Sequence, residues 1–516
     1  MRKDIDYFIQ KHFDKVLRDI VDLIQIKSIT YNASENKRAL NVFLDKAKTM
    51  GLKTMITSGE DVGIVELGHG KDTIGILVHL DVAPEGDIDK WSYPPFKGEI
   101  SKGYIWGRGV EDNKGPAVMC LHALKALKEL NIPLEKKIWL IVGTSGDGEW
   151  KDIANFKKEF EVPQFGFAPD GDFPIFTKEK GYCDIKLFFH EPEIEKIEIL
   201  RGGTSLNSIP SKATVKIHNH EEKVYKGISC HSSTPALGIN AITKMAGECD
   251  EIKDFNFVRF IKDFFMDGRN GEKLGIDFSH NRRNALSERT SLAPTVLSIN
   301  GGYVEMCINL RLWFDITKDR VTEAFQKYAH EYNYSFRILE YLDPMVVDEK
   351  EGFVQTMADV YREYGFTPAF PISMATSCAK TMRHFVGWGP VMEHEKSFSH
   401  KEDERMSIES MITATQMYTT YLARVASPYG IGLKNKKQSS LEKALSLLKF
   451  FVTDPYHYDV PTLAGLTGMN KTTIYRNLCS LERVGILEKD DDTKLYSIGP
   501  MAFRMYQAYL KEKEND

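Results

Sequence analysis

The sequence predicts an α/β fold with a mostly parallel sheet at its centre. Thr73–His79 and Lys137–Val142 are short apolar runs rich in β-branched residues, which is typical of buried strands. Between them, Pro116–Leu130 has apolar residues at helical spacing. This order of strand, helix and strand favours a parallel sheet with covering helices.

A second unit is predicted inside the first. The region from Phe188 to Leu342 contains charged, alternating segments such as Lys196–Arg201 and Ala213–His218. Alternation of this kind is typical of half-exposed antiparallel strands, so we expect an inserted α+β unit. The helix-like stretches Val354–Tyr364 and Met406–Leu422 then complete the first unit.

A small final domain is predicted after a linker that is rich in glycine and lysine. Leu441–Val452, Val460–Thr467 and Asn470–Glu482 have the apolar spacing of three helices, and Asn470 suits the N-cap of the third. Two short strands are expected to follow, at Val484–Glu488 and Lys494–Ile498.

Length and composition restrict the class of protein. A chain of 516 residues exceeds one hydrophobic core, so two to four domains are expected. The net charge of -5 argues against a chain wrapped wholesale around nucleic acid but permits a local basic face. Seven scattered cysteines without a Cys-x-x-Cys pair favour a reducing, cytoplasmic compartment. No apolar run of about 18 residues occurs, so no membrane span is expected.

Several side chains suited to metal binding lie at predicted strand ends and turns. Strand alternation directs His79 and Asp81 to the same side, which suits an imidazole ligand oriented by a carboxylate. Asp112 lies in a glycine-rich turn before a helix, Asp170 in a turn after an apolar stretch, and His400 after a later loop. A lone His-x-Asp pair is more often structural, so the whole set carries the indication.

The order and spacing of these motifs resemble the two-zinc dipeptidases of the PepV, carnosinase and carboxypeptidase G type, over roughly residues 10 to 425. The resemblance implies a zinc-peptidase-like fold with an inserted lid domain. It also implies one or two Zn²⁺ ions, with Mn²⁺ or Co²⁺ as alternatives, because carboxylates mixed with imidazoles suit these ions. The implied metal ligands are His79, Asp112, Asp147, Asp170 and His400, with Asp81 as the partner that orients His79.

The resemblance extends to the inserted unit. Its implied substrate-binding residues are Asn207, His231 and Arg311. In the family the histidine stabilises the tetrahedral oxyanion, and the other two residues hold the substrate. From the residues alone, a turn asparagine, a loop histidine and an ordinary strand arginine stay open as alternatives.

The chain departs from the family at Gly143–Asp147. The family has Gly-Thr-Asp-Glu-Glu there, and its first Glu is the general base while its second is a metal ligand. Here Gly146 stands at the position of the base and Asp147 at that of the ligand. General acid–base assistance is typically worth about 10²–10⁴-fold, so we expect hydrolysis to be weak or absent. Glu149 stays open as a substitute base, although it lies three residues further on.

A second departure lies at Met374–Lys380, where the family has a Gly-Gly-Gly-Thr-type loop ending in Ala-Arg that grips the substrate. Side chains in place of glycines are expected to reshape or narrow that pocket. A retained metal cage without the proton shuttle indicates a binding domain derived from an enzyme.

The final domain resembles the winged helix-turn-helix domain of IclR-type transcription regulators over nearly its full length. Ile474, Leu478 and Leu481 are expected to face its core. The residues expected to face DNA from the first turns of the recognition helix are Lys471, Thr472, Thr473, Tyr475 and Arg476. Two alternatives stay open: these residues only cap the helix and meet solvent, or the module docks proteins.

We therefore predict five segments. They are the first part of the peptidase-like metal domain (residues 1–185), the inserted lid domain (186–344), the second part of the metal domain (345–427), a linker (428–438) and the winged helix (439–516).

The predicted function is that of a DNA-binding transcription regulator. Its degenerate metallopeptidase-like domain would bind a dipeptide or a related amino-acid ligand together with a divalent metal. Because one recognition helix reads only a half-site, we expect a homodimer on a DNA operator. The alternative is an active zinc-dependent dipeptidase, or a bifunctional dipeptidase and regulator.

Overall fold

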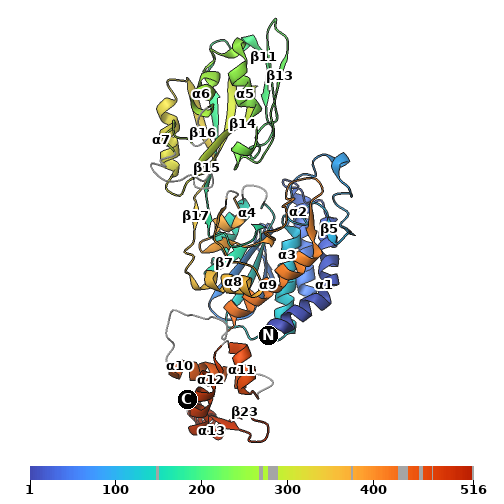
Figure 1. Cartoon of the computed structure of the whole chain (residues 1–516), viewed down its shortest axis with the longest axis vertical. Coiled ribbons are helices and arrows are strands. Elements are labelled where there is room, and N and C mark those ends of the chain that lie inside the picture. Colours follow the sequence, from blue (N-terminus) through green and yellow to red (C-terminus); the bar gives the residue numbers. More distant parts are fainter. Residues whose placement is uncertain are drawn as a thin grey trace. The chain divides into compact units, whose positions relative to one another are not determined.

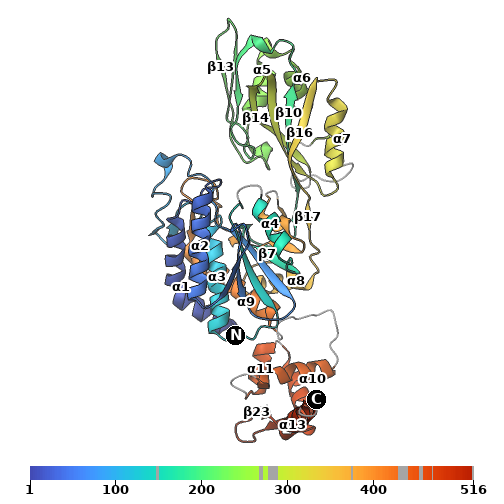
Figure 2. The ribbon, with the colours of Figure 1, turned by 180° about the vertical axis from the view of Figure 1, so that it is seen from behind.

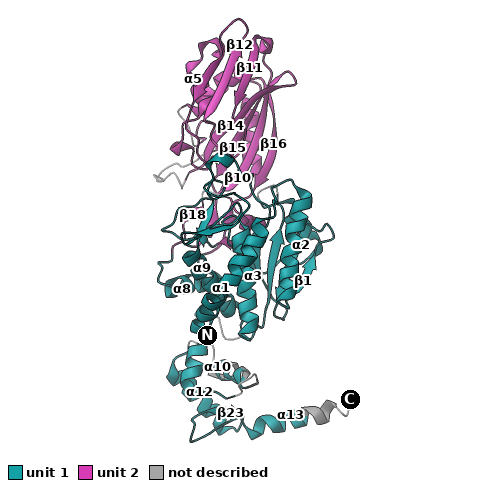
Figure 3. Ribbon diagram, turned by 90° about the vertical axis from the view of Figure 1, so that its right-hand side faces the viewer, with its two compact units in different colours: residues 1–174, 349–368, 388–516 teal, residues 175–348, 369–387 magenta. Residues whose placement is uncertain are grey.

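The structure is a computed structural model that describes residues 1–146, 150–266, 271–276, 289–373, 376–427, 440–452, 457–467 and 469–513. The chain forms two compact units (Figure 3). Unit 1 comprises residues 1–174, 349–368 and 388–516, and unit 2 comprises residues 175–348 and 369–387. Unit 2 is thus inserted into the chain of unit 1.

Unit 1 contributes five strands to a mixed sheet, in the order β1-β2-β6-β3-β7. The strands are Lys53–Ile56 (β1), Gly63–Leu67 (β2), Lys137–Gly143 (β6), Thr73–His79 (β3) and Phe165–Ala168 (β7). β3 pairs in parallel with β6 and β7, whereas β2 pairs antiparallel with β1 and β6. Every residue of β3 is buried, as its continuous apolar run predicts. The two predicted strands are therefore confirmed.

Helices surround this sheet. They are Arg2–Ile24 (α1), Ala33–Thr49 (α2), Lys114–Glu129 (α3), Lys151–Glu159 (α4), Gly352–Glu363 (α8) and Ile408–Ala426 (α9). α1, α2 and α3 lie side by side (Figures 1 and 2). α3 is buried almost all round because it packs against α1, α9 and β3. None of the described helices is long and apolar enough to cross a membrane.

Short pairings join distant segments of unit 1. β4 (Glu99–Ser101), β5 (Tyr104–Trp106) and β21 (Arg405–Ser407) form a small sheet, and β8 (Gly171–Asp172) pairs in parallel with β20 (Pro390–Val391). A 3-10 turn, η1, spans Ile88–Lys90. The loop after β5 contains Asp112, the residue before β8 is Asp170, and the loop between β20 and β21 contains His400. These pairings bring three remote loops into one part of the fold.

Unit 2 contains a seven-stranded antiparallel sheet with the order β13-β12-β11-β14-β15-β10-β16. The strands are Gly181–Phe189 (β10), Ile197–Gly202 (β11), Lys212–Ile217 (β12), Lys223–Lys226 (β13), Ser291–Asn300 (β14), Tyr303–Leu312 (β15) and Tyr334–Leu342 (β16). The predicted antiparallel α+β unit is therefore confirmed.

Three helices complete the core of unit 2: Ala241–Glu248 (α5), Asn256–Phe265 (α6) and Lys318–Tyr328 (α7). One apolar cluster joins them to the sheet, and Leu200 and Val215 point into it from β11 and β12. The remaining elements of the unit are short. They are Lys178–Glu179 (β9), Met345–Val346 (β17), Ile372–Ser373 (β18), Phe385–Gly387 (β19), Ile194–Lys196 (η2), Pro235–Leu237 (η3), Asp250–Ile252 (η4) and Cys378–Thr381 (η6).

The C-terminal segment has its own apolar core. Its elements are Ser440–Leu448 (α10), Lys449–Val452 (η7), Val460–Thr467 (α11), Lys471–Arg483 (α12), Leu487–Lys489 (β22), Tyr496–Ile498 (β23) and Pro500–Lys513 (α13). The predicted N-cap is confirmed, since the Asn470 side chain accepts a 2.7 Å hydrogen bond from the Thr473 amide. Ile474, Leu478 and Leu481 are buried as expected. The predicted linker, residues 428–438, lies outside the described residues.

Candidate metal centre

Two strands of the unit 1 sheet deliver candidate metal ligands at their carboxyl ends. His79 is the last residue of β3, and Asp170 follows the end of β7 by two residues. β3 and β7 are parallel neighbours, so their ends meet at one edge of the sheet. In open α/β sheets, ligands bind in the crevice outside such strand ends.

One donor atom from each of His79, Asp112 and Asp170 lies within 4.8 Å of the others. The His79 Nε2 atom is 3.1 Å from Asp112 Oδ1 and 3.6 Å from Asp170 Oδ1. The Asn113 side chain contributes to this arrangement, because its Nδ2 donates to the carbonyl of Pro169 at 2.6 Å. An imidazole nitrogen facing two carboxylates is a donor set that suits a divalent cation.

Asp112 lies between two imidazoles. Its Oδ1 faces His79, while its Oδ2 is 2.8 Å from the Nε2 of His400. The hydroxyl of Ser399 donates to the same Oδ2 at 2.6 Å. One carboxylate with an oxygen toward each histidine is the arrangement that a bridging ligand between two cations requires.

Asp81 orients His79 through Nδ1, the ring nitrogen that does not face Asp112 and Asp170. The Nδ1 atom of His79 is 3.0 Å from the Asp81 carbonyl and 3.3 Å from its Oδ1. Thr30 donates to the other carboxylate oxygen of Asp81 at 3.1 Å. These contacts leave Nε2 of His79 facing the carboxylates, as a metal-ligating histidine needs.

The electrostatics of this cluster indicate a deficit of positive charge. Burial lowers the pKa of His79, but its hydrogen bonds to Asp112, Asp170 and Asp81 outweigh burial and hold the pKa well above its usual value. Burial raises the pKa of Asp112, yet His400 and His79 hold it well below the usual range. The carboxylates therefore attract a positive charge that a divalent cation can supply, and the residues present fit such an ion.

Two buried carboxylates that sequence reasoning missed hold the loops of this site. Glu404 is fully buried and accepts hydrogen bonds from the Arg108 guanidinium and from the amides of Gly109, Glu111 and Asp112. In return, Glu111 accepts from the amides of Phe398 and Ser399 at 2.8 and 3.0 Å. The only signals for them in the sequence are their places, next to Asp112 and four residues after His400.

Gly146 lies against the His79 ring. An ideal Cβ on Gly146 would be 2.0 Å from Cγ and 2.3 Å from Cδ2 of His79, so a side chain requires movement of the loop or the ring. The Gly146 amide donates to Asp81 Oδ1 at 2.6 Å, and its carbonyl accepts from the Trp150 indole at 2.7 Å. At the position where the family has its general base, this chain therefore has only backbone atoms, which lie against the His79 ring.

Two predicted site residues next to Gly146 lie outside the described residues. They are Asp147, the implied fifth metal ligand, and Glu149, the substitute base. Met374 and Ala375 of the second departure from the family also lie outside. Their roles stay predictions.

In unit 2, a buried hydrogen-bond network connects two of the predicted substrate-binding residues. Arg311 donates through Nε to the Asn309 side chain at 3.2 Å, and Asn309 donates to Asp184 at 2.8 Å. The hydroxyl of Tyr182 donates to Asp184 at 2.5 Å, and the same oxygen lies 3.2 Å from the side-chain oxygen of Asn207. Sequence reasoning missed the three connecting residues because they carry no motif.

The third predicted residue of this group lies beside the same network. The Nδ1 atom of His231 is 2.6 Å from the hydroxyl of Ser233, and the intervening Ser232 donates to Asn309 at 2.9 Å. Arg311 also donates to the Thr376 hydroxyl at 2.7 Å. Asn207, His231 and Arg311 thus belong to one polar cluster of unit 2.

In the C-terminal segment, α12 exposes most of the residues predicted to face DNA. Lys471, Thr472, Tyr475 and Arg476 are exposed and Thr473 is half-buried, while Ile474 points into the core. The acidic turn between β22 and β23 is partly satisfied internally, since Asp490 accepts from the amides of Asp492 and Thr493. α12 therefore presents a polar, partly basic face to solvent.

The family model of peptidase family M20/M25/M40 matches residues 75–424. The chain belongs to this family. A model of the IclR helix-turn-helix domain matches residues 440–491. The protein therefore joins an M20 peptidase-type domain to a DNA-binding-type domain in one chain.

Curated relatives match about four fifths of the chain. "Putative dipeptidase YtjP" of Bacillus subtilis (strain 168) is 28% identical over 463 residues, which cover 80% of this chain and 97% of the relative. A "Putative dipeptidase" of Staphylococcus aureus (strain MW2) is 25% identical over 461 residues, with the same coverage of 80% and 97%.

Solved structures agree in fold. Human carnosine dipeptidase 1 has a TM-score of 0.57 at 15% sequence identity, and the match covers 83% of this chain and 100% of that one. The dipeptidase Dug1p of Saccharomyces cerevisiae has a TM-score of 0.57 at 13% identity, covering 82% and 98%. At these identities the likeness concerns the M20 fold alone.

The position of Gly146 makes a prediction about this M20 domain. Gly146→Ala is expected to weaken Zn²⁺ binding by about tenfold or more, because the new Cβ displaces His79 from its carboxylate partners. Competition with a chromophoric chelator measures the affinity. Gly171→Ala, directly after Asp170, is the matched control, since a Cβ there meets nothing within 4 Å. Equal zinc affinities for the two variants would contradict the account.

Proposed function

We propose that this protein is a DNA-binding transcription regulator whose M20-type domain binds a dipeptide or a related amino-acid derivative together with a divalent metal. The contact of Gly146 with His79 carries the proposal. It supports the proposal because His79, Asp112 and Asp170 cluster while the position of the family's general base carries no side chain. A domain that keeps its ligands but lacks its proton shuttle is suited to binding rather than turnover.

The metal would be held by His79, Asp112, Asp170 and His400, with Asp147 as a further ligand. When bound, the ion supplies a Lewis acid that attracts a carboxylate, carbonyl or amine of the ligand. His79 is kept in the required orientation by Asp81, which also receives the Gly146 amide. The mixed imidazole and carboxylate set favours zinc, with manganese or cobalt as substitutes.

The small ligand would be recognised by Asn207, His231 and Arg311. Arg311 is buried, and its planar guanidinium suits the carboxylate of a peptide or amino acid. Its connection to Asn207 through Asn309, Asp184 and Tyr182 supports a common role, because a fully bonded polar network fixes side-chain orientation.

DNA binding would occur through α12. Its exposed Lys471, Tyr475 and Arg476 project from the first turns, where side chains of a recognition helix reach base edges and phosphates. A single such helix covers one half-site, which supports a homodimer on a two-fold operator. Ligand binding would alter DNA affinity if the two conformations of the protein bind the ligand unequally.

The rival function is a working dipeptidase, with or without DNA binding. Two observations favour it: the described metal ligands are clustered, and the curated relatives are named as dipeptidases. In this case Glu149 would have to act as the general base in place of Gly146.

A turnover assay separates the two. We expect no hydrolysis above background for a panel of dipeptides with added Zn²⁺ or Mn²⁺, because a missing general base typically lowers the rate by about 10²–10⁴-fold. Robust hydrolysis that His79→Ala abolishes would contradict the proposal. If Glu149→Gln also abolishes it while metal content stays unchanged, the rival mechanism is supported.

DNA binding is tested by fluorescence anisotropy with a site selected from random duplexes. Arg476→Ala is expected to weaken binding by about tenfold or more, because a base or phosphate contact from a recognition helix is worth about 1–3 kcal/mol. Arg483→Ala removes the same charge from the last residue of α12 and serves as the control. Failure to select any site, or equal losses in both variants, would count against α12 as the DNA reader.

A further inference from the structure

One face of the β11–β12 strand pair in unit 2 carries two cations close together. Arg201 pairs with Thr214 in the antiparallel register, and Lys212 lies two residues from Thr214 on the same strand. Arg201 and Lys212 are therefore diagonal neighbours on the same face, with Cα atoms about 7–8 Å apart. The opposite face of this pair is apolar, since Leu200, Ala213 and Val215 belong to the core.

Neither cation has a carboxylate partner among the ion pairs of the described residues. By contrast, Lys216, four residues along β12, pairs with Glu198 at 2.7 Å. Two like charges on neighbouring strands repel each other, and an anion bound near both relieves that repulsion. Arg201 and Lys212 therefore form a place that attracts an anion.

The loop after β11 contributes hydroxyl groups to the cavity that Arg201 and Lys212 also line. Gly203 has a φ of +67°, and a Cβ there would lie 1.9 Å from the carbonyl oxygen of Thr295. A residue without a side chain is thus required for the chain to leave the strand so close to β14. Thr204 and Ser205 of this loop line the same cavity as Arg201 and Lys212, and Ser208 is fixed by a 2.9 Å hydrogen bond to Ser229.

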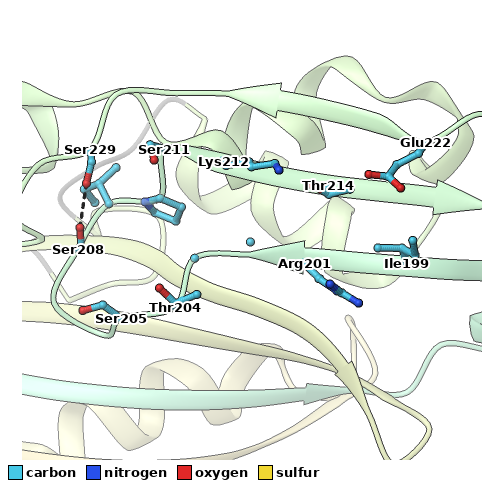
Figure 4. Close-up of a pocket in the computed structure, with 14 residues that line it drawn as sticks. Ile199, Arg201, Thr204, Ser205, Ser208, Ser211, Lys212, Thr214, Glu222 and Ser229 are labelled. Atoms are coloured by element: carbon cyan, nitrogen blue, oxygen red, sulfur yellow. Dashed lines mark hydrogen bonds between the residues drawn. The ribbon is translucent and has the colours of Figure 1, made fainter. Parts of the chain in front are cut away.

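These side chains line one cavity of about 450 Å³ (Figure 4). Ile199, Ile209 and Pro210 supply its apolar surface. Figure 4 places the Ser208–Ser229 pair at one end and Glu222 at the other, with Arg201 and Lys212 on neighbouring strands between them. The volume lies within the range of small-molecule sites, about 300–1,000 Å³.

We propose that this cavity binds a small oxyanion, the phosphate or carboxylate group of a polar metabolite. Arg201 and Lys212 hold the anionic group, and the hydroxyls of Thr204 and Ser205 donate to its oxygens. The carboxylate of Glu222 repels a second anionic group at the far end, so the ligand carries its charge at one end only. Charge-assisted hydrogen bonds from two cations give such a site its affinity.

No candidate metal ligand lines this cavity, although its Ser208 follows Asn207 in the chain and forms a β-bridge with His231. All of its lining residues lie between positions 199 and 229 of unit 2, whereas the candidate metal ligands belong to unit 1.

Isothermal titration calorimetry of the full chain tests the proposal. Inorganic phosphate and acetate, whose charge lies at one end only, are titrated separately into metal-free protein at constant ionic strength, so that bound metal does not take up either anion. We expect saturable binding of at least one. Binding of phosphate alone identifies a phosphorylated ligand, and binding of acetate alone a carboxylate ligand.

Matched variants locate the binding. Arg201→Gln and Lys212→Gln are each expected to weaken it by about tenfold or more, since each removes charged hydrogen bonds. Lys216→Gln makes the same change on β12 at a lysine already paired with Glu198, and is expected to leave affinity unchanged. All three side chains lie at the surface of the sheet, so their melting temperatures should match. Absence of binding by both anions, or an equal loss in Lys216→Gln, would overturn the proposal.

Discussion

The candidate metal centre depends on two buried carboxylates, Glu404 and Glu111. Each lies in one loop of the site and accepts hydrogen bonds from backbone amides of the other loop. Glu404 follows His400 in the chain and gathers the amides around Asp112, while Glu111 precedes Asp112 and gathers the amides before His400. The segments are nearly 300 residues apart, yet each supplies the acceptors for the other's buried N–H groups. A buried carboxylate that accepts several N–H bonds is costly to remove, because its donors would be left unpaired. This reciprocal bonding keeps Asp112 between two imidazoles.

The lack of a side chain at position 146 limits the chemistry expected of this site. Glycine at position 146 allows the backbone to approach His79 and to donate to Asp81, so the loop reinforces the orientation of a metal ligand. The same contact leaves no room for a side chain at that position. Under the proposed function, metal binding without turnover would follow from this one local conformation. An added DNA-binding-type domain gives such a binding site a use other than turnover.

Much of this could be predicted from the sequence, because it rests on local patterns. The burial of β3 follows from its apolar run, and the clustering of His79 with Asp112 and Asp170 follows from motif order. Glu404 and Glu111 could not be predicted, because their partners are backbone amides of a remote loop, which no periodicity marks. Sequence identified the loss at Gly146 but not its closeness to His79, which depends on the path that Asp81 and Trp150 impose on the loop.

The central claim is that ligand binding at the M20-type site controls DNA binding, and one measurement tests it most directly. The DNA affinity of the zinc-loaded protein is determined with and without a saturating dipeptide, in the natural chain and in His79→Ala. Coupling between two sites is typically about 1–3 kcal/mol, so the account predicts a change in Kd of at least about fivefold. The change should vanish in His79→Ala. An unchanged Kd in the natural chain with the dipeptide demonstrably bound would contradict the account.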